Sequence, residues 1–315
     1  MTHIGIDILG GDWAPEAALS GSLSALNLLG ENTILHFIGP QNLVQQHLDE
    51  QHPALAKKAV IHPTDDFVEM GENPVKALQK KPQASINIGC ALMAKGVLNG
   101  FASAGNSGAL MVAAMHFLKP INGVSRPCVV SAFPQKNEHK NVLVDVGINA
   151  DAKPEMLVQF AKLGQLYSHH VLGVKSPRVA LLNTGAEPSK GSLLYQKTHE
   201  LLTDAKDITF VGNLEARDFY DGVSDVTVCD GFTGNVVLKQ AEGFYNLLKH
   251  QNIEDPFIEK FNYEEYGGTP ILGVNGNVIL GHGISSSKAI CNMILATEKV
   301  AKANLALHIN KAFNK

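Results

Sequence analysis

"VCDGFTGNVVLK", residues 228–239, places an aspartate, two glycines, a threonine and an asparagine between two apolar segments. Apolar runs favour burial, whereas the residues between them favour turns and local hydrogen bonds. We therefore expect residues 228–229 to end a buried strand, residues 230–235 to form a turn and residues 236–239 to begin a helix. A strand, a short polar turn and a helix form the unit from which α/β folds are built.

The same unit recurs along the chain, where short apolar runs precede longer helical patterns. Runs this short, continuous and rich in β-branched residues suit strands that helices cover on both faces, which is typical of parallel sheets. The sequence thus predicts an α/β/α sandwich with a mostly parallel sheet, formed by residues 1–315 as a single domain. Strands are expected within residues 4–9, 34–39, 100–105, 141–147, 178–185, 208–213, 225–231 and 277–280. Helices are expected at residues 15–29, from residue 41, and at residues 109–118, 154–167 and 192–202.

The composition excludes several classes of protein. A net charge of -4 provides no basic field for nucleic acid. The longest apolar run, residues 109–118, is about half the length of a membrane-spanning helix. The N-terminus resembles no signal peptide, so we expect a cytoplasmic protein. Cysteines that form no CxxC pair predict buried free thiols rather than disulfides or a zinc site; they are Cys90, Cys128, Cys229 and Cys291.

Six of the expected strand ends carry glycine together with Asn, Ser, Thr or Asp. A glycine-rich turn that leads into a helix offers backbone N–H groups and a positive dipole end to an anion. One such loop is more often only a turn and a helix cap, but a parallel sheet brings several to one edge. The loops therefore predict an anion-binding cleft. Its candidate residues are Gly10, Gly11, Asp12, Asn106, Ser107, Gly108, Asn183, Gly185, Asp230, Gly231, Thr233, Gly234 and Asn235.

Three basic side chains and four aspartates lie in these loops. Lys190 stands between Pro188-Ser189 and Gly191, and His282 stands between two glycines, where a functional role and a capping role are equally open. Lys288 is a weaker candidate, since an isolated lysine is usually a solvated surface charge. Capping or ordering a turn is the simpler role for the aspartates at the strand ends, which are Asp7, Asp12, Asp145 and Asp230.

Standard catalytic and nucleotide-binding motifs are missing from the sequence. There is no GxxxxGK[ST] loop, no GxGxxG spacing, no GxSxG nucleophile elbow and no HExxH pair. No cofactor and no metal ion are therefore expected.

Several motifs together resemble the bacterial phosphate acyltransferases. These are "DILGGDWAPE", "SAGNSGAL", "LVDVGINAD", "LLNTGAEPSKG", "CDGFTGNVVLK" and "GGTPILGVNG" followed by "GHGISSSKAI". The family converts acyl-acyl-carrier-protein and inorganic phosphate into acyl phosphate, the first committed step towards glycerophospholipids. The resemblance implies a Rossmann-like three-layer fold related to phosphotransacetylases, a homodimer, and acyl carrier protein as partner. A downstream membrane acyltransferase is a further expected partner.

The sequence departs from the family pattern in two places. The family usually has histidine where Trp13 stands, so an imidazole is not required there. Many members carry a longer apolar insert where this chain has "NIEDPFIEKFN", residues 252–262. Only Phe257, Ile258 and Phe261 could make an apolar contact there, so we expect membrane association to be weak or partner-mediated.

The reaction needs little covalent help, because phosphate is already a nucleophile and a thioester is already activated. We expect the glycine loops and Asp7 to hold phosphate, with Lys190, His282 and Asn235 as catalytic candidates. Basic residues should attract the acidic carrier protein, and Lys80, Lys81, Lys119 and Arg126 are candidates. Two alternatives stay open: a phosphotransacetylase-like enzyme that uses acyl-CoA, and a non-catalytic acyl- or lipid-binding protein on the same fold.

Overall fold

The computed structural model describes residues 1–51 and 57–314. The chain divides into two compact units, each built from two separate segments. Unit 1 comprises Met1–Pro120 and Tyr263–Ala306, and unit 2 comprises Ile121–Asn262 and Leu307–Lys315. The chain passes from one unit to the other three times, so neither unit is a single continuous segment. The single domain stays a prediction, and each unit is described by itself.

The sheet of unit 1 has the order β3-β2-β1-β4-β11-β10. Its strands are parallel except for β10, which pairs antiparallel with β11. The strands are β1 (Thr2–Asp7), β2 (Thr33–Gly39), β3 (Ala59–Pro63), β4 (Gly100–Ser103), β10 (Thr269–Leu272) and β11 (Val278–Leu280).

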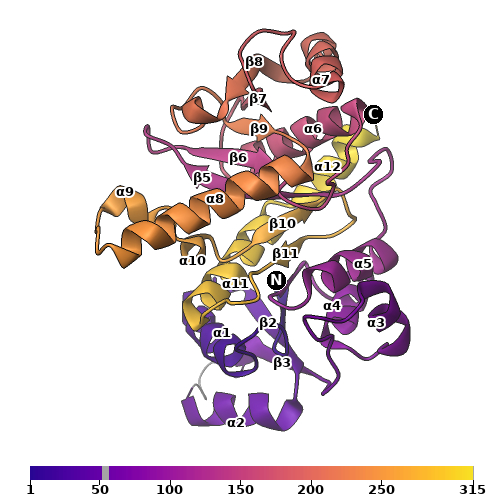
Figure 1. The fold of residues 1–315 in the computed structure, drawn as a ribbon. Coiled ribbons are helices and arrows are strands. Elements are labelled where there is room, and N and C mark those ends of the chain that lie inside the picture. Colours follow the sequence, from indigo (N-terminus) through magenta and orange to yellow (C-terminus); the bar gives the residue numbers. More distant parts are fainter. Residues whose placement is uncertain (52–56, 315) are drawn as a thin grey trace. The chain divides into compact units, whose positions relative to one another are not determined.

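Helices cover both faces of this sheet. In Figure 1, α1 and α11 lie on one side of the strands, and α3, α4 and α5 lie on the other. The core contains fully buried side chains such as Ile6, Phe37 and Phe101, each of which contributes about 1.5–3 kcal/mol on burial. The helices are α1 (Glu16–Leu28), α2 (Gln41–Gln51), α3 (Pro74–Lys80), α4 (Ser85–Ala94), α5 (Ser107–Phe117), α10 (Tyr263–Tyr266) and α11 (Ser287–Lys302).

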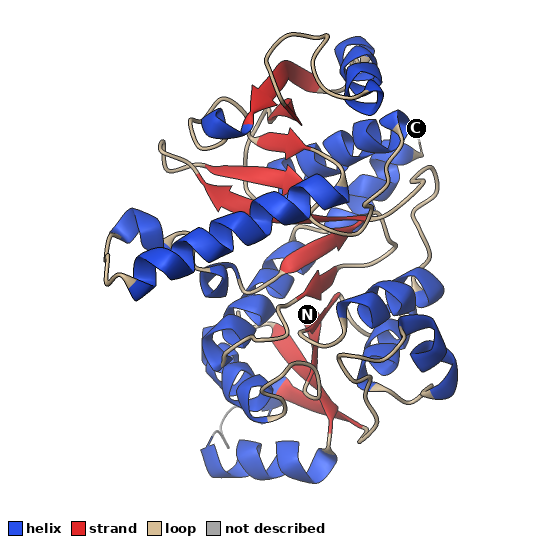
Figure 2. Ribbon diagram, viewed as in Figure 1, coloured by secondary structure: helices blue, strands red, loops and turns tan. Residues whose placement is uncertain are grey.

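The sheet of unit 2 has the order β5-β6-β9-β7-β8 and is parallel except for the pair β5 and β6. Helices α6 and α7 pack together beside it, while α8 crosses in front of the strands in the view of Figures 1 and 2. The strands are β5 (Cys128–Pro134), β6 (Lys140–Val144), β7 (Arg178–Asn183), β8 (Thr209–Glu215) and β9 (Val226–Val228). The helices are α6 (Pro154–His170), α7 (Leu193–Asp204), η2 (Ala216–Asp218), α8 (Gly231–His250), α9 (Pro256–Glu259) and α12 (Leu305–Phe313).

The predicted α/β fold with a mostly parallel sheet is confirmed within each unit. The predicted turn at residues 230–235 is wrong, because α8 already begins at Gly231. Asp230 caps the helix there by accepting a hydrogen bond from Thr233 N. The glycines of this stretch therefore lie inside the first turns of a helix.

In the segment 252–262 after α8, Phe257 and Phe261 pack within unit 2, whereas Ile253 is 43% exposed. The ring of Phe261 contacts Tyr220 with centroids 5.3 Å apart and Phe257 with centroids 5.7 Å apart. Phe257 and Ile258 are both half-buried. No helix among residues 1–51 and 57–314 is both long enough and apolar enough to cross a membrane.

A row of three histidines runs across β1, β2 and β3. His3 Nδ1 lies 2.8 Å from His36 Nε2, and His36 Nδ1 lies 2.8 Å from His62 Nε2. His36 is only 4% exposed. Burial, reinforced by the neighbouring His62 and His3, lowers the pKa of His36 to about 4. The unfolded chain should protonate this side chain near its ordinary pKa of about 6.5.

This row predicts that unit 1 loses stability in mild acid. Between about pH 6.5 and pH 4 the unfolded state binds a proton at His36 that the folded state rejects, so the free energy of unfolding falls as the pH falls. The loss should reach about 2–3 kcal/mol near pH 4. Urea unfolding at a series of pH values measures it. His36→Gln should flatten the slope and the exposed His139→Gln should not; equal slopes in all three proteins would contradict the prediction.

Candidate functional site

In unit 1, the loop after β1 is built on a buried carboxylate. Asp7 is 1% exposed and accepts hydrogen bonds from Leu9 N at 3.0 Å and Ser103 Oγ at 2.7 Å. Burial raises the pKa of this carboxyl. A Cβ on Gly10 would lie 2.5 Å from Asp7 Oδ2 and 2.7 Å from Gly105 N, so only glycine fits there. Asp7 and Gly10 thus join the loop after β1 to the loop after β4.

The same loop is tied to the segment that carries His282. After Gly11, the Asp12 N–H donates to Gly283 O at 2.7 Å. The His282 ring lies 5.2 Å from the Tyr263 ring, centroid to centroid. A pocket of about 640 Å³ opens between the first turns of α1 and α11. It is lined by Asp12, Trp13, Ala14, Glu16, Ala17, Ser20, Ser286 and Ser287.

The loop before α5 is held by hydrogen bonds of the Asn106 side chain. Asn106 Oδ1 caps α5 by accepting from Ala109 N at 3.0 Å, and its Nδ2 donates to the carbonyl oxygens of Glu69, Met70 and Glu72. Ser107, the next residue, is exposed. A Cβ on Gly108 would lie 2.6 Å from the Pro74 ring. Asn106 therefore orders this loop, and its binding of phosphate stays a prediction.

In unit 2, a second buried carboxylate organises the loop after β6. Asp145 is fully buried. Its Oδ1 accepts from Val129 N at 3.0 Å. Its Oδ2 accepts from Ile148 N at 3.2 Å, from Asn149 N at 2.7 Å and from Asn149 Nδ2 at 2.9 Å. With four N–H donors on one carboxylate, the loop at residues 145–149 has a fixed shape.

The start of α8 rests directly on that loop. Gly231 N donates to Asn149 O at 2.8 Å, and a Cβ on Gly234 would collide with the backbone oxygen of Asp145. Asn235 is exposed and lies against Gly147. Asp230, and not Asn235, caps α8, and the side chain of Asn235 lies beside Gly147. Gly234 is needed because a backbone passes where its side chain would stand.

Lys190 lies in the loop between β7 and α7, with its side chain over Gly185. A Cβ on Gly185 would stand 2.8 Å from Lys190 Cγ. The Lys190 side chain is 49% exposed, and its Nζ lies 4.0 Å from Glu187 Oε2. Asn183 Nδ2 donates to Lys190 O at 3.2 Å. This loop therefore presents a partly exposed ammonium group at the carboxyl end of β7.

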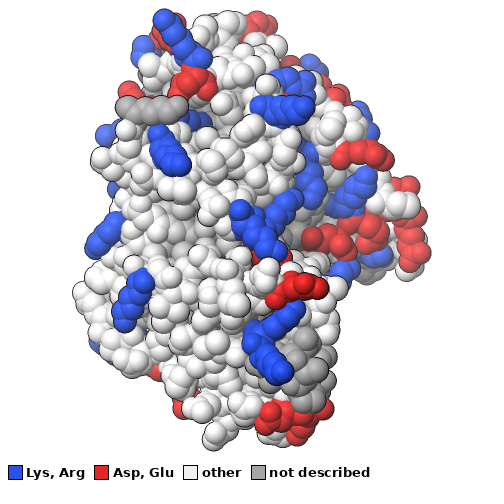
Figure 3. Space-filling model, turned by 180° about the vertical axis from the view of Figure 1, so that it is seen from behind, with Lys and Arg blue, Asp and Glu red and all other residues white. Residues whose placement is uncertain are grey.

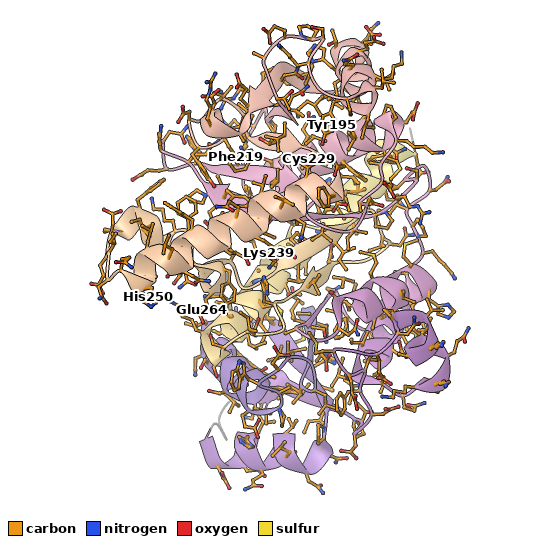
Figure 4. All side chains as sticks on the ribbon, in the orientation of Figure 1. Tyr195, Phe219, Cys229, Lys239, His250 and Glu264 are labelled. Carbon is orange, nitrogen blue, oxygen red and sulfur yellow. The ribbon has the colours of Figure 1, made fainter. Side chains whose placement is uncertain are left out.

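Tyr195 joins the Lys190 loop to the start of α8. Its hydroxyl donates to Asp230 Oδ2 at 2.5 Å, which Thr233 Oγ1 also contacts at 2.8 Å. Figure 4 shows Tyr195 and Cys229 near the end of α8 at which that helix begins. In unit 2 the structure thus brings together the predicted residues Asp230, Thr233 and the loop of Lys190.

Sequence reasoning missed Ser103, Asn149 and Tyr195. Ser103 lies within a strand that we predicted, and Asn149 stands four residues after an aspartate at a strand end, so both carry a local signal. Tyr195 lies within a predicted helix, and nothing in its surroundings points to Asp230. Among the described residues no group of three or more His, Cys, Asp or Glu side chains is placed to hold a metal ion.

Solved structures define the class of fold. A phosphotransacetylase from Streptococcus pyogenes matches with a TM-score of 0.66 at 19% identity, covering 96% of this chain and 94% of that one. A branched-chain phosphotransacylase from Enterococcus faecalis matches with a TM-score of 0.62 at 15% identity, covering 96% and 99%. The chain therefore has the phosphotransacetylase fold.

Sequence relatives then give the family. The family model described as "Fatty acid synthesis protein" matches residues 2–308. A phosphate acyltransferase from Halothermothrix orenii is 40% identical over 333 aligned positions, covering 99% of both chains. One from Salinibacter ruber is 38% identical, covering 99% of this chain and 98% of that one. The chain belongs to the fatty acid synthesis protein family, together with these phosphate acyltransferases, as the motif resemblance predicted.

Proposed function

We propose that this chain forms acyl phosphate by transferring an acyl group from acyl-acyl-carrier-protein to inorganic phosphate. The observation that carries the proposal is the match to phosphate acyltransferases over almost the whole chain. The geometry adds an ammonium group, Lys190, on a loop at the end of β7, suited to a phosphate dianion. The product would enter glycerophospholipid synthesis.

The chemistry is a single displacement at the thioester carbonyl. A phosphate oxygen bonds to the carbonyl carbon, the carbon–sulfur bond breaks, and the thiolate leaves and takes up a proton. No acyl-enzyme is needed, and the cysteines suit none: all four are buried, and burial raises the pKa of the Cys128 and Cys229 thiols. For His282 we retain the role of hydrogen-bond or proton donor as a prediction.

The partners follow from the substrate. The face in Figure 3 shows basic and acidic side chains interspersed over a largely uncharged surface. An acidic carrier protein would therefore be attracted by local lysines rather than by the charge of this face as a whole. Of the candidates, Lys81 is already paired with Glu72 at 2.7 Å, which leaves Lys80, Lys119 and Arg126. We further propose a cytoplasmic homodimer that hands acyl phosphate to a membrane acyltransferase, with weak membrane contact of its own.

An assay of the purified protein tests this function. Acyl-acyl-carrier-protein is mixed with inorganic phosphate, and the free carrier-protein thiol is followed with a thiol reagent, with acyl-CoA as the comparison substrate. We expect thiol release that requires phosphate and is faster with the carrier protein. Faster release from acyl-CoA would favour the phosphotransacetylase-like alternative, and no release from either would favour a binding protein. Added salt should raise the KM for acyl-acyl-carrier-protein.

A further inference from the structure

We infer that Tyr195 is a positioning residue for acyl transfer, which holds the Lys190 loop against the first turn of α8. This inference rests on the proposed function for its kinetic consequences. Its structural content rests on two sets of hydrogen bonds within unit 2, made by the adjacent α7 residues Tyr195 and Gln196.

The first set runs from Tyr195 to α8. The Tyr195 hydroxyl donates to Asp230 Oδ2 at 2.5 Å and accepts from Asp230 N at 3.3 Å. Asp230 in turn accepts from Thr233 N at 2.9 Å and Thr233 Oγ1 at 2.8 Å. One carboxylate therefore caps α8 and receives the tyrosine, so a shift of α7 against α8 would break the Tyr195 contact.

The second set runs from the next residue of α7 back to the Lys190 loop. Gln196 Nε2 donates to Ser189 O at 2.9 Å and to Gly191 O at 3.0 Å, on either side of Lys190. A Cβ on Gly191 would lie 3.0 Å from Tyr195 Cβ, so the loop packs closely on the same turn. Tyr195 and Gln196 together link the Lys190 backbone to the start of α8.

The tyrosine is suited to hold this link at working pH. Burial and the adjacent Asp230 carboxylate raise the pKa of Tyr195, so its hydroxyl stays a hydrogen-bond donor in neutral and moderately alkaline solution. A hydrogen bond to a charged acceptor is among the stronger ones in proteins. Asp230 keeps its Thr233 contacts without the tyrosine, so removal of the hydroxyl should loosen the loop and leave α8 capped.

Tyr195→Phe tests the inference, with Tyr220→Phe as the matched control in the same unit. We expect Tyr195→Phe to lower kcat/KM for phosphate about tenfold, the equivalent of one charged hydrogen bond, with KM for acyl-acyl-carrier-protein within about twofold of wild type. Because Tyr195 acts through Lys190, adding Tyr195→Phe to Lys190→Ala should cost less than about a further twofold. Tyr220→Phe should leave these kinetic constants unchanged, both in the wild type and in Lys190→Ala.

Additive losses in the double variant, or wild-type kinetics in Tyr195→Phe, would overturn the inference. Hydrogen–deuterium exchange provides a second readout that needs no activity. Exchange in residues 183–192 should quicken in Tyr195→Phe and stay unchanged in Tyr220→Phe. If the wild type releases no thiol but exchange in residues 183–192 is still faster in Tyr195→Phe, the proposed function fails while the positioning contact stands. Unchanged exchange would overturn the contact itself.

Discussion

Asp145→Ala is expected to lower the free energy of unfolding of unit 2 by about 4 kcal/mol or more. The carboxylate is fully buried and accepts four N–H hydrogen bonds, from Val129, Ile148 and twice from Asn149. Alanine would leave four donors without an acceptor, three of them buried, and each buried donor costs about 1–3 kcal/mol. Since whole proteins have only about 5–15 kcal/mol of stability, this single change should remove a large part of it.

Urea unfolding followed by circular dichroism measures the loss. The matched control is Asp151→Ala, an exposed aspartate two residues beyond the loop, which should unfold within about 0.5 kcal/mol of wild type. Asp145→Asn should fall between the two, because the amide oxygen still accepts while its NH₂ group faces other donors. Coincident unfolding curves for Asp145→Ala and Asp151→Ala would show that the buried carboxylate does not organise this loop.

The strands that sequence reasoning found are those with short apolar runs and at least one parallel neighbour. They are β1, β2, β4, β6, β7, β8, β9 and β11. β3 was missed because its apolar run covers only residues 59–61 and it ends in Pro63; none of its residues is fully buried. β10 is short and contains Pro270, which favours a turn in any local reading. β5, "CVVSAFP", was also missed, although its apolar and β-branched residues could have predicted it.

The candidate site was predicted as a set of loops rather than as a set of contacts. A glycine next to an aspartate signals a tight turn, and at residues 230–235 that local signal gave the wrong element. The glycines are there because the loop of Asp145 passes too close for any side chain, and that loop is distant in sequence: Gly231 meets Asn149 and Gly234 meets Asp145. Tyr195 shows the same limit, since its partner lies 35 residues away. Such distant pairings leave no periodic pattern.

Lys190→Ala is expected to slow acyl phosphate formation about tenfold or more, since one contact to a charged group is worth about 1.5–3 kcal/mol. The ammonium group lies 4.0 Å from Glu187, so under the proposed function it would meet a phosphate dianion as a weakly paired cation. The side chain is half exposed, so the stability of unit 2 should change by less than about 0.5 kcal/mol. Turnover with saturating acyl-acyl-carrier-protein and varied phosphate measures the effect.

The control for this variant comes from the same part of the chain. Lys197→Ala removes an exposed lysine of α7 that is paired with Glu200 at 2.7 Å, and it should leave turnover unchanged. Lys190→Arg keeps the positive charge but places it farther from the backbone, so it should recover part of the activity if charge is what the site requires. Turnover near that of wild type in Lys190→Ala would exclude this lysine from phosphate binding. In that case the structural link through Tyr195 would hold a loop with no catalytic cation, and the anion-binding groups would have to be sought among the backbone amides at the strand ends.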